Sequence, residues 1–257
     1  MKIIITAGGT TEQIDSVRTI SNISTGRLGS LIANAFSVLP DVDEIYYLCN
    51  KASIQPQADK VKIFHVNNVA DLEFTIKSIF AVNDIDIIIH SMAVSDYRVK
   101  SVTSAFNLAS TMISRQGILK NINEEDAESL ITSLLDESKS VIGGNGKISS
   151  SIDNMLLVME RTPKIISMFQ KISPQSILVG FKLLDDVQYE VLIDTAFDIL
   201  QENRCSFVLA NDLRDIDNDN HIGYLIDRHK EYDRFTTKEE IASAIVAASI
   251  AERKNLK

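Results

Sequence analysis

Short apolar runs alternate along the chain with amphipathic stretches of helical length. The runs are rich in Ile, Val, Leu, Tyr and Phe, so we expect strands near 2–7, 43–48, 61–66, 84–90, 155–160, 175–181 and 206–210. The stretches between them predict helices near 26–38, 69–81, 162–171, 188–203 and 237–254. This alternation predicts an α/β fold with a Rossmann-like, mainly parallel sheet and helices on both faces.

Two segments interrupt the alternation. Residues 101–154 are polar, with one helical piece near 123–139, and a long excursion of this kind usually forms a flap or lid. Residues 221–235 alternate around a polar turn and predict a C-terminal β-hairpin, which either rejoins the sheet or reaches a second subunit. We expect a single α/β domain over 1–257 that carries both features.

The last predicted helix has two candidate starting points. Thr236-x-x-Glu239 and Thr237-x-x-Glu240 each match a capping box, in which the threonine and the glutamate bond each other's backbone N–H groups. The sequence leaves both possibilities open.

Composition narrows the classes of function. The 257 residues include 26 Lys and Arg and 35 Asp and Glu, a net charge of −9, which argues against nucleic acid and an anionic membrane surface as partners. Cys49 and Cys205 follow no metal or disulfide spacing, which favours buried thiols in a reducing compartment. Because the N-terminal apolar run is too short for a signal peptide and no segment reaches the length of a membrane span, we expect a cytoplasmic protein.

Two small-residue turns near the N-terminus are the strongest candidates for a binding site. The first predicted strand leads into Ala7-Gly8-Gly9-Thr10, and a second turn follows at Ser24-Thr25-Gly26, just before Gly29. Glycines at a strand end let the backbone approach a ligand, and a helix starting at the second turn would direct N–H groups and its dipole at a phosphate. Each turn alone has a plain structural explanation, but the pair favours binding.

The polar segment 11–21 between these turns brings further candidates. Arg18 suits a phosphate or carboxylate, and its alternative is a salt bridge with Asp15 or Glu12. Asn22 is either a ligand contact or a turn residue that bonds its own backbone. We expect Asp15 to order the segment or a subunit contact.

Five ordered blocks carry a resemblance to a known family. The first is Thr6-Ala7-Gly8-Gly9-Thr10 followed by Ile14-Asp15-x-Val17-Arg18-x-Ile20-x-Asn22-x-Ser24-Thr25-Gly26-Arg27-x-Gly29. The others lie at 93–98, 146–150, 179–183 and 210–212. Together they resemble phosphopantothenate-cysteine ligase, also called phosphopantothenoylcysteine synthetase, over roughly residues 1 to 235. Since no fused decarboxylase is visible, the chain is similar to a stand-alone bacterial form whose decarboxylase partner is a separate protein.

The resemblance implies a nucleotide site and a catalytic set. The residues that it implies for nucleotide binding are Gly8, Gly9, Thr10, Ser24, Thr25, Gly26, Ala93, Asp96, Pro163, Lys164, Phe181 and Lys182. For Phe181, base stacking competes with plain core packing. The catalytic set is Asn22, which would donate to the acyl oxygen, together with Arg18 and Lys147. Lys147 would be a mobile flap cation, and its alternative is a solvated loop lysine.

The implied reaction joins 4′-phosphopantothenate to L-cysteine through an acyl nucleotidylate, within coenzyme A biosynthesis. It needs ATP or CTP with Mg²⁺ on the triphosphate, and no protein-built metal site is expected. CTP is slightly favoured, although Ile199 and Asn203 stand where CTP-using members carry lysines and Lys182 is a possible substitute. The family implies a homodimer.

Two other classes of function remain open. An NAD(P) oxidoreductase shares the strand-glycine-helix opening, but Gly8-Gly9 lacks the G-x-G-x-x-G spacing. A non-catalytic nucleotide- or pantetheine-sensing module would need the cleft but not Lys147.

Overall fold

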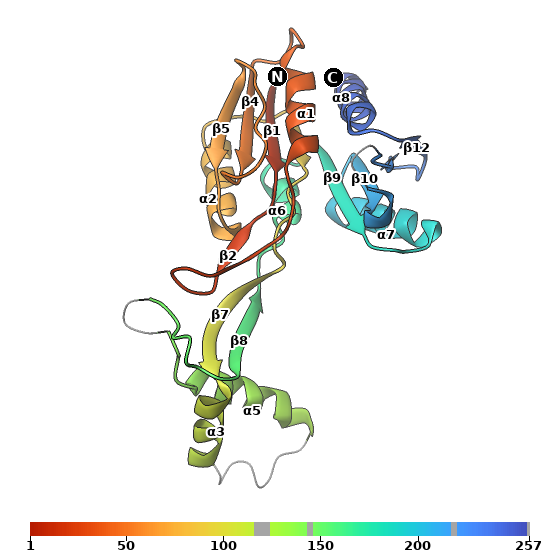
Figure 1. Ribbon diagram of the computed structural model, residues 1–257. Helices are drawn as coiled ribbons and strands as arrows, with labels where there is room; N and C mark the ends of the chain where they lie inside the picture. Colours follow the sequence, from red (N-terminus) through yellow and green to blue (C-terminus); the bar gives the residue numbers. More distant parts are fainter. Residues whose placement is uncertain (116–123, 143–145, 217–219, 256–257) are drawn as a thin grey trace. The chain divides into compact units, whose positions relative to one another are not determined.

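The structure is a computed structural model that describes residues 1–115, 124–142, 146–216 and 220–255. The chain folds into two compact units, which Figure 1 colours along the sequence. The sheet unit consists of Met1–Thr10, Asn22–Val94 and Lys164–Lys257. The insert unit consists of Thr11–Ser21 and Ser95–Pro163.

An eight-stranded sheet forms the centre of the sheet unit, in the order β12-β11-β10-β9-β6-β1-β4-β5. The strands are β1 Lys2–Ala7, β4 Glu44–Cys49, β5 Val61–His65, β6 Ile87–His90, β9 Ile177–Leu184, β10 Phe207–Asp212, β11 Gly223–Ile226 and β12 Tyr232–Phe235. Neighbours from β10 to β5 run parallel, and β11 and β12 run antiparallel. The predicted mainly parallel sheet is therefore confirmed.

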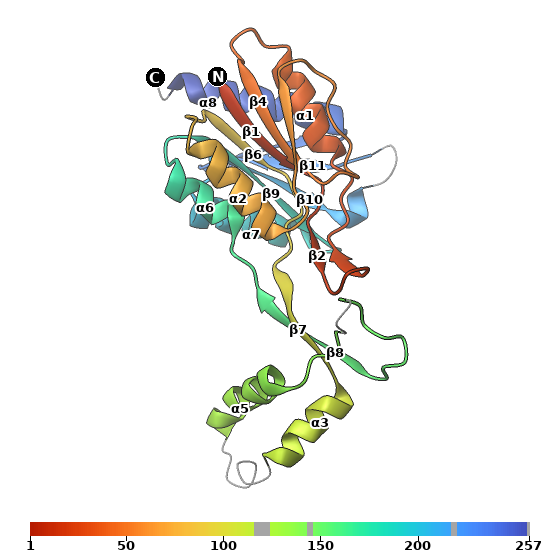
Figure 2. The ribbon, with the colours of Figure 1, turned by 90° about the vertical axis from the view of Figure 1, so that its left-hand side faces the viewer.

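Helices cover both faces of this sheet, because alternate residues of each buried strand are apolar on opposite sides (Figure 2). Ile4 of β1 packs in the core under α2, α6 and α7, whereas Ile3 and Ile5 pack under α1 and α8. These helices are α1 Arg27–Ser37, α2 Val69–Phe80, α6 Ile165–Ile172, α7 Tyr189–Asn203 and α8 Lys238–Asn255, with a short 3-10 helix at Leu213–Asp215.

The C-terminal part of the chain matches the sequence closely. The predicted hairpin rejoins the sheet, since β11 pairs with β10 and β12 forms the edge. Of the two capping boxes, Thr237 with Glu240 forms: the Glu240 N–H donates to Thr237 Oγ1 at 3.1 Å, and the Thr237 N–H donates to Glu240 Oε2 at 3.3 Å.

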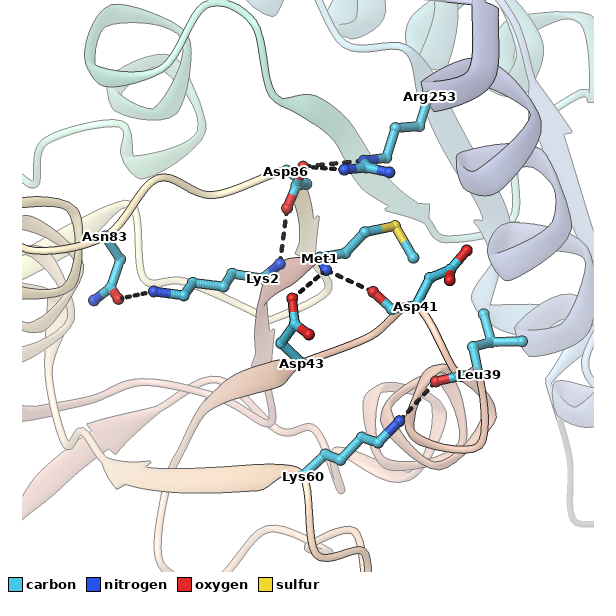
Figure 3. Close-up of polar contacts among 9 residues, drawn as sticks. All are labelled: Met1, Lys2, Leu39, Asp41, Asp43, Lys60, Asn83, Asp86 and Arg253. Atoms are coloured by element: carbon cyan, nitrogen blue, oxygen red, sulfur yellow. Dashed lines mark hydrogen bonds and ion pairs between the residues drawn. The ribbon is translucent and has the colours of Figure 1, made fainter. Parts of the chain in front are cut away.

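The amino-terminal edge of the sheet is held by ion pairs and hydrogen bonds (Figure 3). Asp86 precedes β6 and accepts from the Lys2 N–H at 2.8 Å, and its other oxygen accepts from Arg253 of α8 at 2.7 and 3.0 Å. The Lys2 ammonium donates to Asn83 Oδ1 at 2.8 Å. These contacts hold the start of β1. Its pairing with β4 and β6 then sets the position of its carboxyl end.

The insert unit contains more structure than the sequence predicts. β7 Tyr97–Ser104 and β8 Met155–Arg161 form an antiparallel ribbon, and α3 Ala105–Ser114 and α5 Glu124–Glu137 follow β7. The helix predicted near 123–139 is confirmed as α5. A small hairpin, β2 Thr11–Gln13 with β3 Thr19–Ser21, lies in the same unit.

Three predictions are corrected here. The strand at 155–160 was wrongly expected in the main sheet: β8 pairs with β7, and none of its residues is fully buried, unlike those of β6. The excursion extends beyond 101–154, over Ser95–Pro163, because β7 supplies a partner for β8. The helix at 162–171 begins only at Ile165, because Thr162 donates to the carbonyls of Asp96 and Ser95 at 3.0 and 2.5 Å. That the units act as one domain stays a prediction.

Candidate functional site

The turn after β1 is a backbone cradle that only glycine can form. Gly8 has a φ of +80°, and a Cβ there would lie 1.9 Å from Ser53 Oγ. A Cβ on Gly9 would lie 2.0 Å from the carbonyl oxygen of Asn22. The Ser53 hydroxyl and the Asn22 carbonyl oxygen thus pack directly against the backbone at the carboxyl end of the first strand, where α/β proteins bind ligands.

The start of α1 meets this cradle. Its N-cap is Gly26, with a φ of +73° and no side-chain cap, and its first turn carries no acidic residue. A Cβ on Gly29 would lie 2.5 Å from the Ala7 Cβ, so α1 packs directly on β1. The dipole and first N–H groups of α1 therefore lie beside Gly8, which is an arrangement suited to phosphate.

A backbone network joins the neighbouring candidates. The Ala93 N–H donates to the Gly8 carbonyl at 2.8 Å, the Thr10 N–H to the Ala93 carbonyl at 3.1 Å, and the Asn22 N–H to the Thr10 carbonyl at 3.1 Å. The structure thus brings six predicted residues together: Gly8, Gly9, Thr10, Asn22, Gly26 and Ala93. Ser24 and Thr25, which directly precede the N-cap Gly26, are exposed.

Three further candidates belong to the sheet unit. Lys164 is exposed at the position before α6, and Lys182 is half-buried on β9. Phe181 packs against the core under α1 and α8, which supports the plain packing interpretation. Its role in stacking on a base stays a prediction.

The remaining candidates, Arg18, Asp96, Lys147 and Pro163, belong to the insert unit. The salt bridge that the sequence allowed as the alternative role of Arg18 is present, because its guanidinium pairs with Asp15 at 2.5 Å. Asp15 also accepts from the N–H groups of Val17 and Arg18, so it orders its segment as expected. Donors from Ile148, Val17 and Arg18 lower its pKa to about 2, although burial acts the other way.

The flap is held more firmly around Lys147 than the sequence suggests. Lys147 itself is exposed, but Gly146 accepts from the Ser16 N–H at 2.9 Å and the Ile148 N–H donates to Asp15 at 3.0 Å. Gly143 and Gly144, which precede Lys147 in the sequence, lie outside the described residues.

His90 and the two cysteines have structural environments. His90 Nδ1 lies 2.8 Å from Thr6 Oγ1, and burial lowers the pKa of its ring to about 4. Burial raises the pKa of Cys49 to about 11 and that of Cys205 to about 12, so both stay protonated near neutral pH. Among the described residues, no three His, Cys, Asp or Glu side chains gather into a possible metal site.

Sequence reasoning missed Ser53, whose side chain lies against Gly8 and Gly26. Its turn follows β4, with the Ser53 N–H donating to the Asn50 carbonyl at 3.0 Å. The sequence could have indicated Ser53, because β4 adjoins β1 in the sheet and small polar residues follow both strands.

A cavity of about 870 Å³ lies elsewhere, at the amino-terminal edge of the sheet beside Asp86 and Arg253. None of the predicted site residues lines it. None of the described helices is long and apolar enough to span a bilayer.

The sheet order and the position of the glycine cradle define a Rossmann-like α/β protein with a glycine turn after its first strand. The chain belongs to the family described as DNA/pantothenate metabolism flavoprotein C-terminal domain, whose profile matches residues 1–146 and 139–252. The resemblance indicated by the five sequence blocks is confirmed at this level.

Relatives and solved structures agree with this assignment. A crystal structure described as the DNA/pantothenate metabolism flavoprotein from Streptococcus pneumoniae is 31% identical, with a TM-score of 0.78, and the match covers 98% of this chain and 99% of that one. The coenzyme A biosynthesis bifunctional protein CoaBC of Methanocaldococcus jannaschii is 26% identical over 95% of this chain and 49% of its own length. The chain thus spans about half the length of that curated relative. A Cab2 mutant in complex with phosphopantothenate-cysteine shares the fold, with 15% identity, a TM-score of 0.66 and coverage of 99% and 87%.

Proposed function

We propose that this chain ligates 4′-phosphopantothenate to L-cysteine with a nucleoside triphosphate, in coenzyme A biosynthesis. The observation that supports this most is the glycine cradle with Asn22 beside it. Both lie at the carboxyl end of β1, which is where α/β proteins bind their ligands. Family membership and the bound phosphopantothenate-cysteine of the Cab2 neighbour support the same substrates.

The chemistry explains why such a site needs no activated nucleophile. A carboxylate does not react with an amine, because oxide would have to leave. The carboxylate of 4′-phosphopantothenate would therefore attack the α-phosphorus of the triphosphate and release pyrophosphate. The cysteine amine would then displace the nucleoside monophosphate and form the amide. Binding, orientation and charge stabilisation are sufficient for both steps.

The roles proposed for the residues follow this chemistry. Gly8, Gly26 and the first N–H groups of α1 would hold phosphate oxygens, and this end of α1 fits an anion because its first turn carries no acidic residue. Asn22 would donate to the acyl oxygen as it gains charge. Arg18 and Lys147 would supply positive charge for the phosphates.

The nucleotide is proposed to be CTP or ATP, with CTP slightly favoured. Mg²⁺ would be carried by phosphate oxygens and water, where it neutralises charge on the triphosphate. We also propose a cytoplasmic enzyme whose product is the substrate of a decarboxylase.

A pyrophosphate-release assay tests the proposed function. The purified chain is mixed with 4′-phosphopantothenate, cysteine and CTP, ATP, GTP or UTP in turn. We expect pyrophosphate release over many turnovers only when all three substrates are present. Release without cysteine incorporation, or none with any nucleotide, would contradict the proposal. A nicotinamide fluorescence titration in parallel tests the oxidoreductase alternative.

A further inference from the structure

Asp15 makes contacts that go beyond ordering its own segment. Its side chain is fully buried, and Oδ1 accepts from the N–H groups of Val17 at 2.9 Å and Arg18 at 2.8 Å. Its other oxygen, Oδ2, accepts from Arg18 Nη1 at 2.5 Å and from the Ile148 N–H at 3.0 Å. One carboxylate therefore connects two segments that are 133 residues apart in the sequence.

Arg18 also contacts Ile148, the residue whose N–H donates to Asp15. Its Nη1 donates to the Ile148 carbonyl at 3.3 Å, so the ion pair binds both the N–H and the carbonyl of Ile148. A second link, from the Ser16 N–H to the Gly146 carbonyl at 2.9 Å, lies two residues earlier on the flap. The Ile148 side chain is 2% exposed, which anchors the segment further.

Lys147 lies between the two anchored positions, Gly146 and Ile148. Its backbone is therefore fixed on both sides, while its side chain is exposed. The same carboxylate also orients Arg18, the second cation proposed for the reaction.

We propose that Asp15 is a positioning residue, which holds Arg18 and the backbone beside Lys147 in one arrangement for the ligation reaction. This inference rests on the proposed function. In this arrangement Lys147 does not act as an independent flap lysine, because the positions of Arg18 and of the backbone beside Lys147 both depend on the buried Asp15 carboxylate. The low pKa of Asp15 keeps this arrangement charged throughout the neutral range.

Asp15→Asn is the direct test, because the amide keeps the size of the side chain but loses its charge and one acceptor. We expect kcat for ligation to fall at least about tenfold and KM for 4′-phosphopantothenate to rise at least about fivefold, as for other misplaced reacting groups. KM for the nucleotide should rise as well, because Arg18 and Lys147 are the cations proposed for the phosphates. A purely structural role would lower the active fraction and leave both KM values unchanged.

Asp136→Asn is the matched control. Asp136 belongs to the same unit and pairs with Lys100 at 2.6 Å, but it does not contact Asp15, Arg18 or Ile148. Equal kinetics for the two variants, with an active wild type, would overturn the positioning role. An inactive wild type would instead contradict the proposed function.

Hydrogen exchange on the wild-type chain keeps the inference testable if Asp15→Asn fails to fold. The Ile148 amide should exchange at least about 100-fold more slowly than the exposed Ser150 amide, because a hydrogen bond in an ordered contact must open first. Equal exchange of these two amides would show that the contact does not persist in solution and would overturn the inference.

Discussion

At the scale of single residues, Asn22 is the proposed catalytic residue that lies beside the glycine cradle. Its carbonyl covers Gly9 and its N–H donates to Thr10, so its backbone is fixed by contacts that do not use the side chain. Asn22→Ala should lower the rate of amide formation about 100- to 1,000-fold, the usual loss for one donor to a developing oxyanion. The thermal midpoint should change little. Steady-state kinetics with calorimetry checks this, and wild-type turnover would contradict the assignment.

His90 gives a prediction for pH dependence. Its pKa is lowered to about 4 by burial, whereas an unfolded chain has a histidine pKa near 6.5. The unfolded state therefore binds more protons between these values, and stability falls as the pH drops from about 6.5 to about 4. The contribution lost is of order 3 kcal/mol. His90→Asn should flatten this part of a urea-unfolding profile, and His65→Asn, at an exposed position, should not.

The positions of the glycines were easier to predict from the sequence than the contacts of the charged residues. Gly8, Gly9 and Gly26 follow from strand and helix boundaries, because close backbone approach has a local signature. The salt bridge of Arg18 with Asp15 is local and was one of the alternatives, whereas the contacts of both side chains with Ile148, far away in the chain, are in no local pattern.

At the scale of elements, the flap carries the next prediction. Lys147 is exposed between two anchored positions, so shortening its side chain uncovers little buried surface. Lys147→Gln should reduce turnover at least about tenfold, by removing a charge near the phosphates, and shift the unfolding midpoint by less than about 1 °C. Lys139→Gln removes another exposed lysine of the same unit and should have no effect on either quantity. Unimpaired synthesis by Lys147→Gln would return Lys147 to a solvated loop lysine.

The main-sheet strands and their helices were predictable because each strand is apolar and each helix has a buried face. β8 was misplaced for the same reason, since Met155–Met159 is as apolar as a buried strand. Its true partner, β7, is largely polar, and only pairing between distant segments identifies it.

At the scale of the whole molecule, we predict a homodimer. β12 is an edge strand of the main sheet, and in the insert unit Phe106, Ile113 and Ile131 are exposed on α3 and α5. Uncovered strand edges and apolar side chains are commonly covered by a second subunit. Light scattering at micromolar concentration should give twice the chain mass of 28.5 kDa. A single-chain mass across the concentration range would contradict this prediction.

The ligation itself is tested most directly by following an oxygen atom. 4′-Phosphopantothenate labelled with ¹⁸O in its carboxylate is incubated with the chain, cysteine and the preferred nucleotide, and the products are analysed by mass spectrometry. If the carboxylate attacks the α-phosphorus, one ¹⁸O must appear in the nucleoside monophosphate for each phosphopantothenoylcysteine formed. Amide product with the label in inorganic phosphate, or no amide product, would contradict the account.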